Sequence, residues 1–283
     1  MPTEDAIPDA RALRVVPRRR PGRWVATAIV LLLLALVVRA FWLGRIEWAV
    51  VAQYLAAPTI LAGLVNTLVM TACAMTLGLV LGVVAAMGTL SPNPVMVGVA
   101  RFYIWFFRGT PLLLQLLLWF NLALVFPRLG LPGIWEVRTV DVITPFVATL
   151  LGLGINQGAY TAEVVRAGIL SVDRGQAEAA QAVGMTRRGA MLRIVLPQAL
   201  RVIVPPVGNE VVSMVKLTSV ASVIQFSEIL RNAQTIYYAN ARVIELLIVA
   251  AAWYLAAVTV LSLLQALLER RLARGVLSAG SRA

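Results

Sequence analysis

Polar side chains recur at helical spacing within two otherwise apolar stretches of the chain. In each set the residues stand at i, i+4 and i+7, so they share one face of a helix. The first set is Asn156, Tyr160 and Glu163, and the second is Asn209, Ser213 and Lys216, with Glu210 next to its first member. Polar groups inside apolar spans are costly and usually face a bundle interior or a water-filled path. We therefore predict that the two faces lie opposite each other across a pathway.

The charged members of these sets could bind the charged groups of a solute. Glu163 or Glu210 could meet a positively charged group, and Lys216 a negatively charged one. A purely structural interpretation stays open. Glu163 stands three residues before Arg166 and could form an ion pair with it, and Lys216 could hold a neighbouring carbonyl.

Several enzymatic chemistries lack their residues. The chain has no histidine, one cysteine (Cys73) and one lysine (Lys216), whose surroundings are not those of a phosphate-binding loop. A Ser-His-Asp triad and a His/Cys zinc site are therefore excluded. We expect no catalytic residues, no metal and no cofactor in this chain.

The composition is that of a membrane protein. The 283 residues are 60% hydrophobic with a mean hydropathy of +0.85, far above a soluble domain. Long unbroken apolar runs favour helices over barrel strands. Six spans are predicted, at about 24–43, 60–88, 101–126, 143–169, 199–224 and 244–268. The first could be a signal peptide, but no small-x-small cleavage site follows it, and we favour an uncleaved anchor.

Basic residues indicate the orientation. With the N-terminus inside, the inner segments hold 17 Lys/Arg and the outer ones 5, as the positive-inside rule requires. We therefore expect a multi-pass protein with both termini in the cytoplasm, including basic tails at 1–23 and 270–283. The same rule accounts for the net charge of +12 without nucleic acid, although the N-terminal arginines suit anionic lipid.

Residues 170–201 are too polar to span a membrane but are rich in helix formers. Gly184 suits the stop of a first short helix, and Thr186 can cap a second one, which should end before Pro197. Small residues on the first helix would let it seat in a partner's groove. From composition alone, an amphipathic helix lying on the membrane is an equal alternative.

Glu178-Ala179-Ala180, Gly184 and Ile194-x-Leu196-Pro197 together resemble the EAA loop of ABC-importer permeases, with all seven positions at the expected spacing. Further matches resemble the branch that carries polar amino acids such as histidine, glutamine and arginine. They are Phe107–Gln115, which contains Arg-Gly-Thr-Pro, Gly158–Ile169, and Pro197–Arg201 followed by Pro205-Pro206. The resemblance covers about 60–270. Two departures are Leu217, where the family usually has Asp, and the additional span at 24–43.

The resemblance implies an all-α integral membrane protein of type I ABC-importer fold, with a five-helix core at 59–269 and an accessory helix at 24–43. The loop at 172–197 would carry the coupling helix, with Glu178, Ala179, Ala180 and Gly184 at the ATPase. Arg108 and Pro111 become gate or bend candidates. The implied partners are two cytoplasmic ATPase subunits that bind ATP, a second permease chain, an extracytoplasmic binding protein and a polar amino acid.

Other function classes are less well supported. A membrane enzyme would need clustered catalytic groups, a channel would need a filter segment, and a gradient-driven transporter would ordinarily show internal repeats. None is evident in the sequence. An opine or a sulfur-containing amino acid stays open as the substrate. The bacterial cytoplasmic membrane is the expected location, and Gly78 and Gly82 predict close packing of two helices.

Overall fold

A computed structural model describes residues 21–131 and 134–273, and the chain divides into two units. In the first unit, helix α1 (Pro21–Leu43) is apolar on all sides and exposed along its length, as suits a helix surrounded by lipid. It corresponds to the predicted span at 24–43. Of the predicted tails at 1–23 and 270–283, residues 21–23 and 270–273 are helical instead, and residues 1–20 and 274–283 lie outside the described residues.

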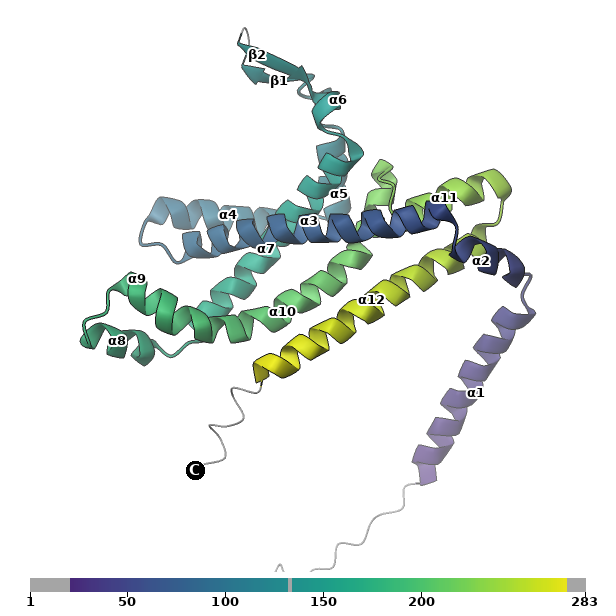
Figure 1. Cartoon of the computed structure of the whole chain (residues 1–283), viewed down its shortest axis with the longest axis horizontal. Helices are drawn as coiled ribbons and strands as arrows, with labels where there is room; N and C mark the ends of the chain where they lie inside the picture. The colour runs from purple at the N-terminus through teal and green to yellow at the C-terminus, as the bar shows by residue number, and fades with distance from the viewer. Residues whose placement is uncertain (1–20, 132–133, 274–283) are drawn as a thin grey trace, which may run out of the picture. The chain divides into compact units, whose positions relative to one another are not determined.

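The second unit, from Trp48 onward, is a helical bundle (Figure 1). Its α-helices are α2 (Trp48–Leu55), α3 (Pro58–Thr89), α4 (Pro94–Gly109), α5 (Leu112–Phe120), α6 (Thr139–Val142), α7 (Pro145–Leu170), α8 (Arg174–Ala182), α9 (Arg187–Ala190), α10 (Leu196–Leu217), α11 (Ile229–Asn240) and α12 (Val243–Ala273). Helices α8 and α9 lie at one end of this unit, and α2 and α11 lie at the other (Figure 1).

Sequence signals explain where the long helices begin. Proline occupies the first turn of α3, α4 and α7, where its missing N–H costs no hydrogen bond. Asn93 caps α4 by accepting from the Val95 N–H at 2.9 Å, and Thr144 caps α7 by accepting from the Val147 N–H at 3.3 Å.

Four helices in the described residues are long and apolar enough to cross a membrane, or up to five if α4 and α5 form one broken span. Helix α7 does not pass this test, although its 26 residues would cover about 39 Å. Its polar residues, Asn156 and Gln157 among them, lower its hydropathy. The count of six spans therefore stays a prediction.

The structure corrects the predicted span at 101–126. This span is not one helix, because α4 and α5 meet at 101°. The break lies at Thr110-Pro111, where proline removes a backbone donor and disfavours helix at the preceding residue. Helices α2 and α11 were not predicted, because their 8 and 12 residues are too few to be recognised as membrane spans.

A small hairpin interrupts the otherwise helical architecture. Strands β1 (Arg128–Leu131) and β2 (Trp135–Arg138) pair antiparallel between α5 and α7 and project away from the bundle (Figure 1). After β2, Arg138 donates to Asp141 at 2.9 and 2.8 Å, and these hydrogen bonds lower the pKa of that carboxyl. The expectation of an all-α chain therefore holds for the bundle but not for this connection.

Two prolines lie inside α10 without breaking it. The helix continues through Pro205 and Pro206, and the Pro205 carbonyl accepts from Asn209 on α10 and from Gln265 on α12. Leu196, the residue before Pro197, is also helical, because a π-helical segment (η3, Met191–Val195) joins α9 to α10. The wider π turn gives the Pro197 ring room that an α turn lacks.

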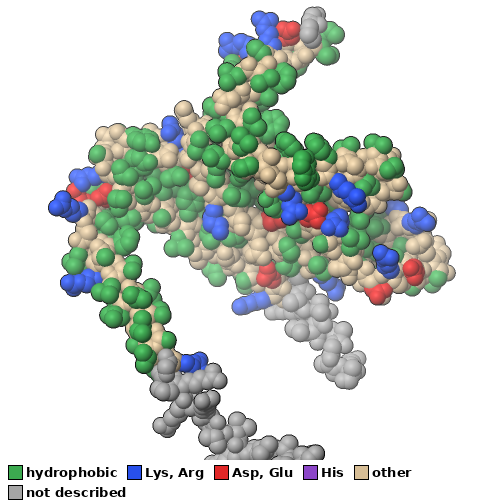
Figure 2. All heavy atoms as spheres, turned by 180° about the vertical axis from the view of Figure 1, so that it is seen from behind, with side chains coloured by type: hydrophobic (Ala, Val, Ile, Leu, Met, Phe, Trp, Pro, Cys, Tyr) green, Lys and Arg blue, Asp and Glu red, His purple; other side chains and the backbone are tan. Residues whose placement is uncertain are grey.

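The core of the bundle is the crossing of α3 and α7, where glycines let two backbones approach closely. A Cβ added at Gly82 would lie 2.7 Å from the Thr161 Cβ and 3.1 Å from the Ala162 nitrogen. A Cβ added at Gly78 would lie 2.7 Å from the Gln157 Cγ. The predicted close packing at these two glycines is therefore confirmed. Hydrophobic side chains cover much of the outer surface (Figure 2), as lipid contact requires.

We expect Gly82→Val to destabilise the bundle by about 1–3 kcal/mol or more, because the added methyl groups overlap a helix backbone that cannot move aside. Thermal unfolding of the purified protein in detergent measures this effect. Gly98→Val on α4 is the matched control, because nothing lies within 4 Å of a Cβ at that position. Equal stability of the two variants would contradict the packing described here.

Candidate functional site

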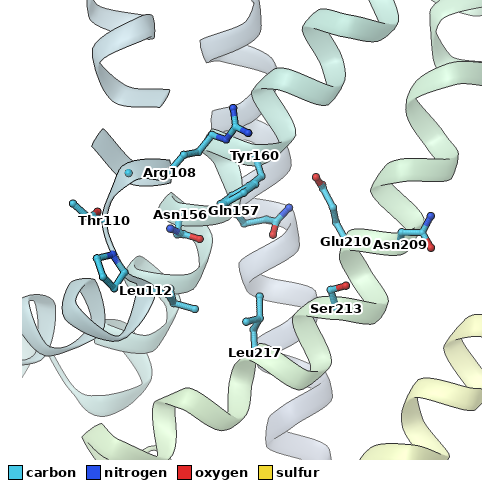
Figure 3. A pocket seen from close by; sticks show the side chains of 12 residues that line it. Arg108, Thr110, Leu112, Asn156, Gln157, Tyr160, Asn209, Glu210, Ser213 and Leu217 are labelled. Carbon is cyan, nitrogen blue, oxygen red and sulfur yellow. The ribbon is translucent and has the colours of Figure 1, made fainter. Parts of the chain in front are cut away.

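A cavity of about 540 Å³ opens where the α4–α5 break faces α7 and α10 (Figure 3). This volume suits a small organic solute. The cavity is lined by Arg108, Gly109, Thr110, Pro111, Leu112, Asn156, Gln157, Tyr160, Asn209, Glu210, Ser213 and Leu217. Most polar residues predicted from helical spacing therefore meet at one place.

Two of the predicted residues lie elsewhere. Glu163 accepts a hydrogen bond from Arg166 at 2.7 Å, which is the ion pair that its i, i+3 spacing allowed. Lys216 is exposed and does not line the cavity. For Glu163 the structural interpretation is therefore the one observed, because one helical face is wide enough to divide between a cavity and another surface.

Arg108 supplies the basic group of the cavity. Its guanidinium carbon lies 5.2 Å from the centroid of the Tyr160 ring, a cation–π distance. Tyr160 itself is 42% exposed, so this pair faces open space and not packed side chains. Arg108 was predicted only as a gate or bend residue. In the structure Arg108, and not Lys216, is the basic residue that lines the cavity.

Glu210 supplies the acidic group from the opposite, α10 side (Figure 3). The Thr161 hydroxyl donates to its Oε2 at 2.9 Å, and Gln157 Nε2 donates to the Thr161 hydroxyl at 3.1 Å. These two hydrogen bonds hold the carboxylate at the cavity wall. None of the ion pairs among the described residues includes Glu210, so its charge has no basic partner there. The cavity thus presents opposite charges on opposite sides.

Sequence reasoning did not assign Gln157, Thr110 or Gln115 to the site. Gln157 adjoins Asn156 and could have been found as a second amide inside an apolar stretch. In the sequence, Gln115 was noted only as part of the segment that contains Arg-Gly-Thr-Pro. Its burial, at 3% exposure, results from the tertiary fold and could not be predicted from the sequence. Within the described part of the chain, no group of three His, Cys, Asp or Glu residues could hold a metal ion.

The first part of the predicted coupling segment, up to the start of α9, has the local structure expected of it. Helix α8 ends at Ala182, and Gly184 then adopts φ +87°, a left-handed conformation that favours glycine. Thr186 accepts from the Gly189 N–H at 3.1 Å and so caps α9, as predicted. Glu178 and Ala179 are exposed, whereas Ala180 is buried. The short helix therefore presents a free outer face.

Comparisons with known proteins agree with this architecture. A family model described as binding-protein-dependent transport system inner membrane component matches residues 78–274. The arginine transport system permease protein ArgU of Corynebacterium glutamicum is 39% identical over 268 residues, covering 94% of this chain and 84% of that protein. The L-cystine transport system permease protein TcyB of Bacillus subtilis is 37% identical, covering 82% of this chain and 93% of that protein.

Solved structures share the fold. A crystal structure of an amino acid ABC transporter with histidines superposes with a TM-score of 0.70 at 37% identity, covering 81% of this chain and all of that chain. A chain of the inward-facing MetNI methionine ABC transporter superposes with a TM-score of 0.61 at 16% identity, which shows a shared fold alone.

Proposed function

The chain belongs to the family of inner membrane components of binding-protein-dependent transport systems, and we propose that it is the permease subunit of an ATP-driven importer of polar amino acids. The substrate class is supported by the cavity between the α4–α5 break, α7 and α10, because Arg108 and Glu210 lie on opposite sides of it. Relatives that transport arginine and cystine support the same class.

Opposite charges across the cavity complement the two ends of an amino acid. We assign the substrate carboxylate to Arg108, whose planar guanidinium can donate two parallel hydrogen bonds. The ammonium is assigned to Glu210, which the Thr161 hydroxyl already orients. Lys216, which spacing alone suggested for the carboxylate, does not line the cavity.

The mechanical part of the proposal rests on α8, Gly184 and α9. We place this segment in the cytoplasm against an ATPase subunit, with a second permease chain completing the pathway and an extracytoplasmic protein delivering substrate. ATP is bound and hydrolysed by the partner subunits. Closure of the ATPase pair would move the coupling segments and tilt the bundles between inward-open and outward-open states. Both termini lie in the cytoplasm in this arrangement.

Uptake into proteoliposomes by the assembled transporter and its binding protein tests the function. We expect ATP-dependent uptake of L-arginine or of another member of a panel containing L-glutamine, L-cystine and nopaline. The last two represent the sulfur-containing and opine alternatives. Failure of every panel member, with the assembled complex hydrolysing ATP, would contradict the proposed substrate class.

Variants of the two charged residues test the assignment within the cavity. Arg108→Met and Glu210→Gln should each lower uptake by about tenfold or more, because each removes a charge-assisted contact. Lys216→Met is the matched control, since it removes a basic side chain from the same helix as Glu210 but outside the cavity. Near-normal uptake by both cavity variants would refute the assignment.

A further inference from the structure

Proline at the α4–α5 break leaves one backbone carbonyl without its helical partner. In an α-helix the carbonyl of Phe107 would accept from the N–H of residue 111. That residue is Pro111, which has no N–H. The carbonyl lies in a partly buried position directly before the cavity-lining Arg108, where an unpaired polar group is unfavourable, so another donor has to be found.

Two side-chain amides from different helices take the place of the missing donor. Gln115 Nε2, on α5, lies 3.0 Å from the Phe107 carbonyl oxygen, and Asn156 Nδ2, on α7, lies 2.8 Å from the same atom. Gln115 also donates to the Thr110 hydroxyl at 2.7 Å and accepts from Asn156 at 3.3 Å. Both amides are buried, at 3% and 9% exposure. We call Gln115 and Asn156 the amide clamp.

The amide clamp holds the backbone directly before Arg108. The Phe107 carbonyl belongs to the peptide bond that leads into Arg108, so fixing this oxygen fixes the direction in which the arginine leaves the chain. One turn beyond Asn156, the Tyr160 ring lies under the guanidinium at 5.2 Å. Helix α7 therefore holds both the backbone and the tip of the same arginine.

We propose that Gln115 and Asn156 are positioning residues, which aim Arg108 at the substrate carboxylate by replacing the hydrogen bond that Pro111 removes. This inference rests on the proposed function, because it takes Arg108 to be the carboxylate-binding group. It goes beyond that function in assigning carboxylate selectivity to two neutral amides, one of which does not line the cavity.

Selectivity for a carboxylate can be measured separately from folding. The purified transporter in nanodiscs is titrated with L-arginine and with L-argininamide, which lacks the carboxylate. The affinity for L-arginine divided by the affinity for L-argininamide is the selectivity ratio, and this ratio is compared among variants. Gln115→Met keeps the side-chain length but removes the donors, and we expect it to reduce the ratio by about tenfold. Asn156→Leu removes the second donor from another helix and should act in the same direction.

A double variant decides whether the amides act through Arg108. Arg108→Met should itself reduce the ratio by about tenfold, and adding Gln115→Met should reduce it no further. Asn121→Leu is the matched control. Asn121, the C-cap residue of α5, also donates its amide to a backbone carbonyl, that of Leu117 at 2.9 Å, but this hydrogen bond does not cross the break.

The outcomes separate the two proposals. A wild-type ratio in Gln115→Met and Asn156→Leu, with a reduced ratio in Arg108→Met, overturns the amide clamp and leaves the proposed function standing. Additive losses in the double variant also overturn it. An unchanged ratio in Arg108→Met overturns the assignment of Arg108 to the carboxylate and, with it, this inference.

Discussion

Gly184→Val should uncouple ATP hydrolysis from transport, and we expect one of the largest functional effects among the substitutions considered. Gly184 has φ +87°, and a β-branched side chain is strongly disfavoured in that region. A penalty of about 1–2 kcal/mol corresponds to roughly a five- to thirtyfold shift away from the observed bend. Uptake should fall by a similar factor, while ATP hydrolysis by the complex continues. Both rates are measured in the same proteoliposomes.

The local environment makes this test specific to the backbone. Nothing lies within 4 Å of a Cβ placed at Gly184, so a larger side chain meets no steric obstacle inside this chain. Val183→Ala is the control, because Val183 is 79% exposed and has an ordinary φ of −88°. Full uptake by Gly184→Val would show that coupling does not depend on the left-handed bend at Gly184.

The second large effect is expected on stability, from Glu228→Ala. Glu228 is fully buried and caps α11, accepting from the Leu230 N–H at 2.8 Å and the Arg231 N–H at 2.6 Å. It also accepts from the Tyr254 hydroxyl on α12. Alanine would leave three donors without their acceptor, at a cost of about 3–5 kcal/mol. Thermal unfolding in detergent and hydrogen exchange of α11 measure the loss.

A second acidic cap provides the matched control. Asp173 caps α8 by accepting from the Gly175 N–H at 2.6 Å, but it is exposed to solvent. Water replaces the carboxylate in Asp173→Ala, so we expect a loss of only about 0.5–1 kcal/mol. Similar losses in the two variants would show that burial of Glu228 contributes nothing.

The bend between α8 and α9 and the long helices could be predicted because their signals are local. Gly184 ends a short helix and Thr186 caps the next one, whatever lies around them. Runs of about twenty apolar residues likewise indicate membrane helices from composition. Predictions based on proline were less successful. The helix breaks at Pro111 but continues through Pro205 and Pro206, and neighbouring donors and acceptors decide which outcome occurs.

Helical periodicity found the faces of the candidate site and, beside one of them, its acidic group Glu210, but not its cation. Asn156 and Tyr160 line the cavity as predicted, whereas Glu163, on the same face, pairs with Arg166. The cation of the site comes from Arg108, nearly fifty residues before Asn156, because α4 ends beside α7. Periodicity along one helix carries no information about which helix faces it.

By itself, the amino-acid sequence indicated the membrane class, the approximate positions of the long helices and the bend at Gly184, which depend on composition and local backbone preference. The family was indicated by the resemblance of its motifs to those of ABC-importer permeases. Only the tertiary structure decided that Arg108 and Glu210 oppose each other and that Gln115 and Asn156 satisfy the Phe107 carbonyl. Such contacts join residues far apart in the chain, and they exist only after the glycine-lined crossing of α3 and α7 and the break at Pro111 have set the helices in place.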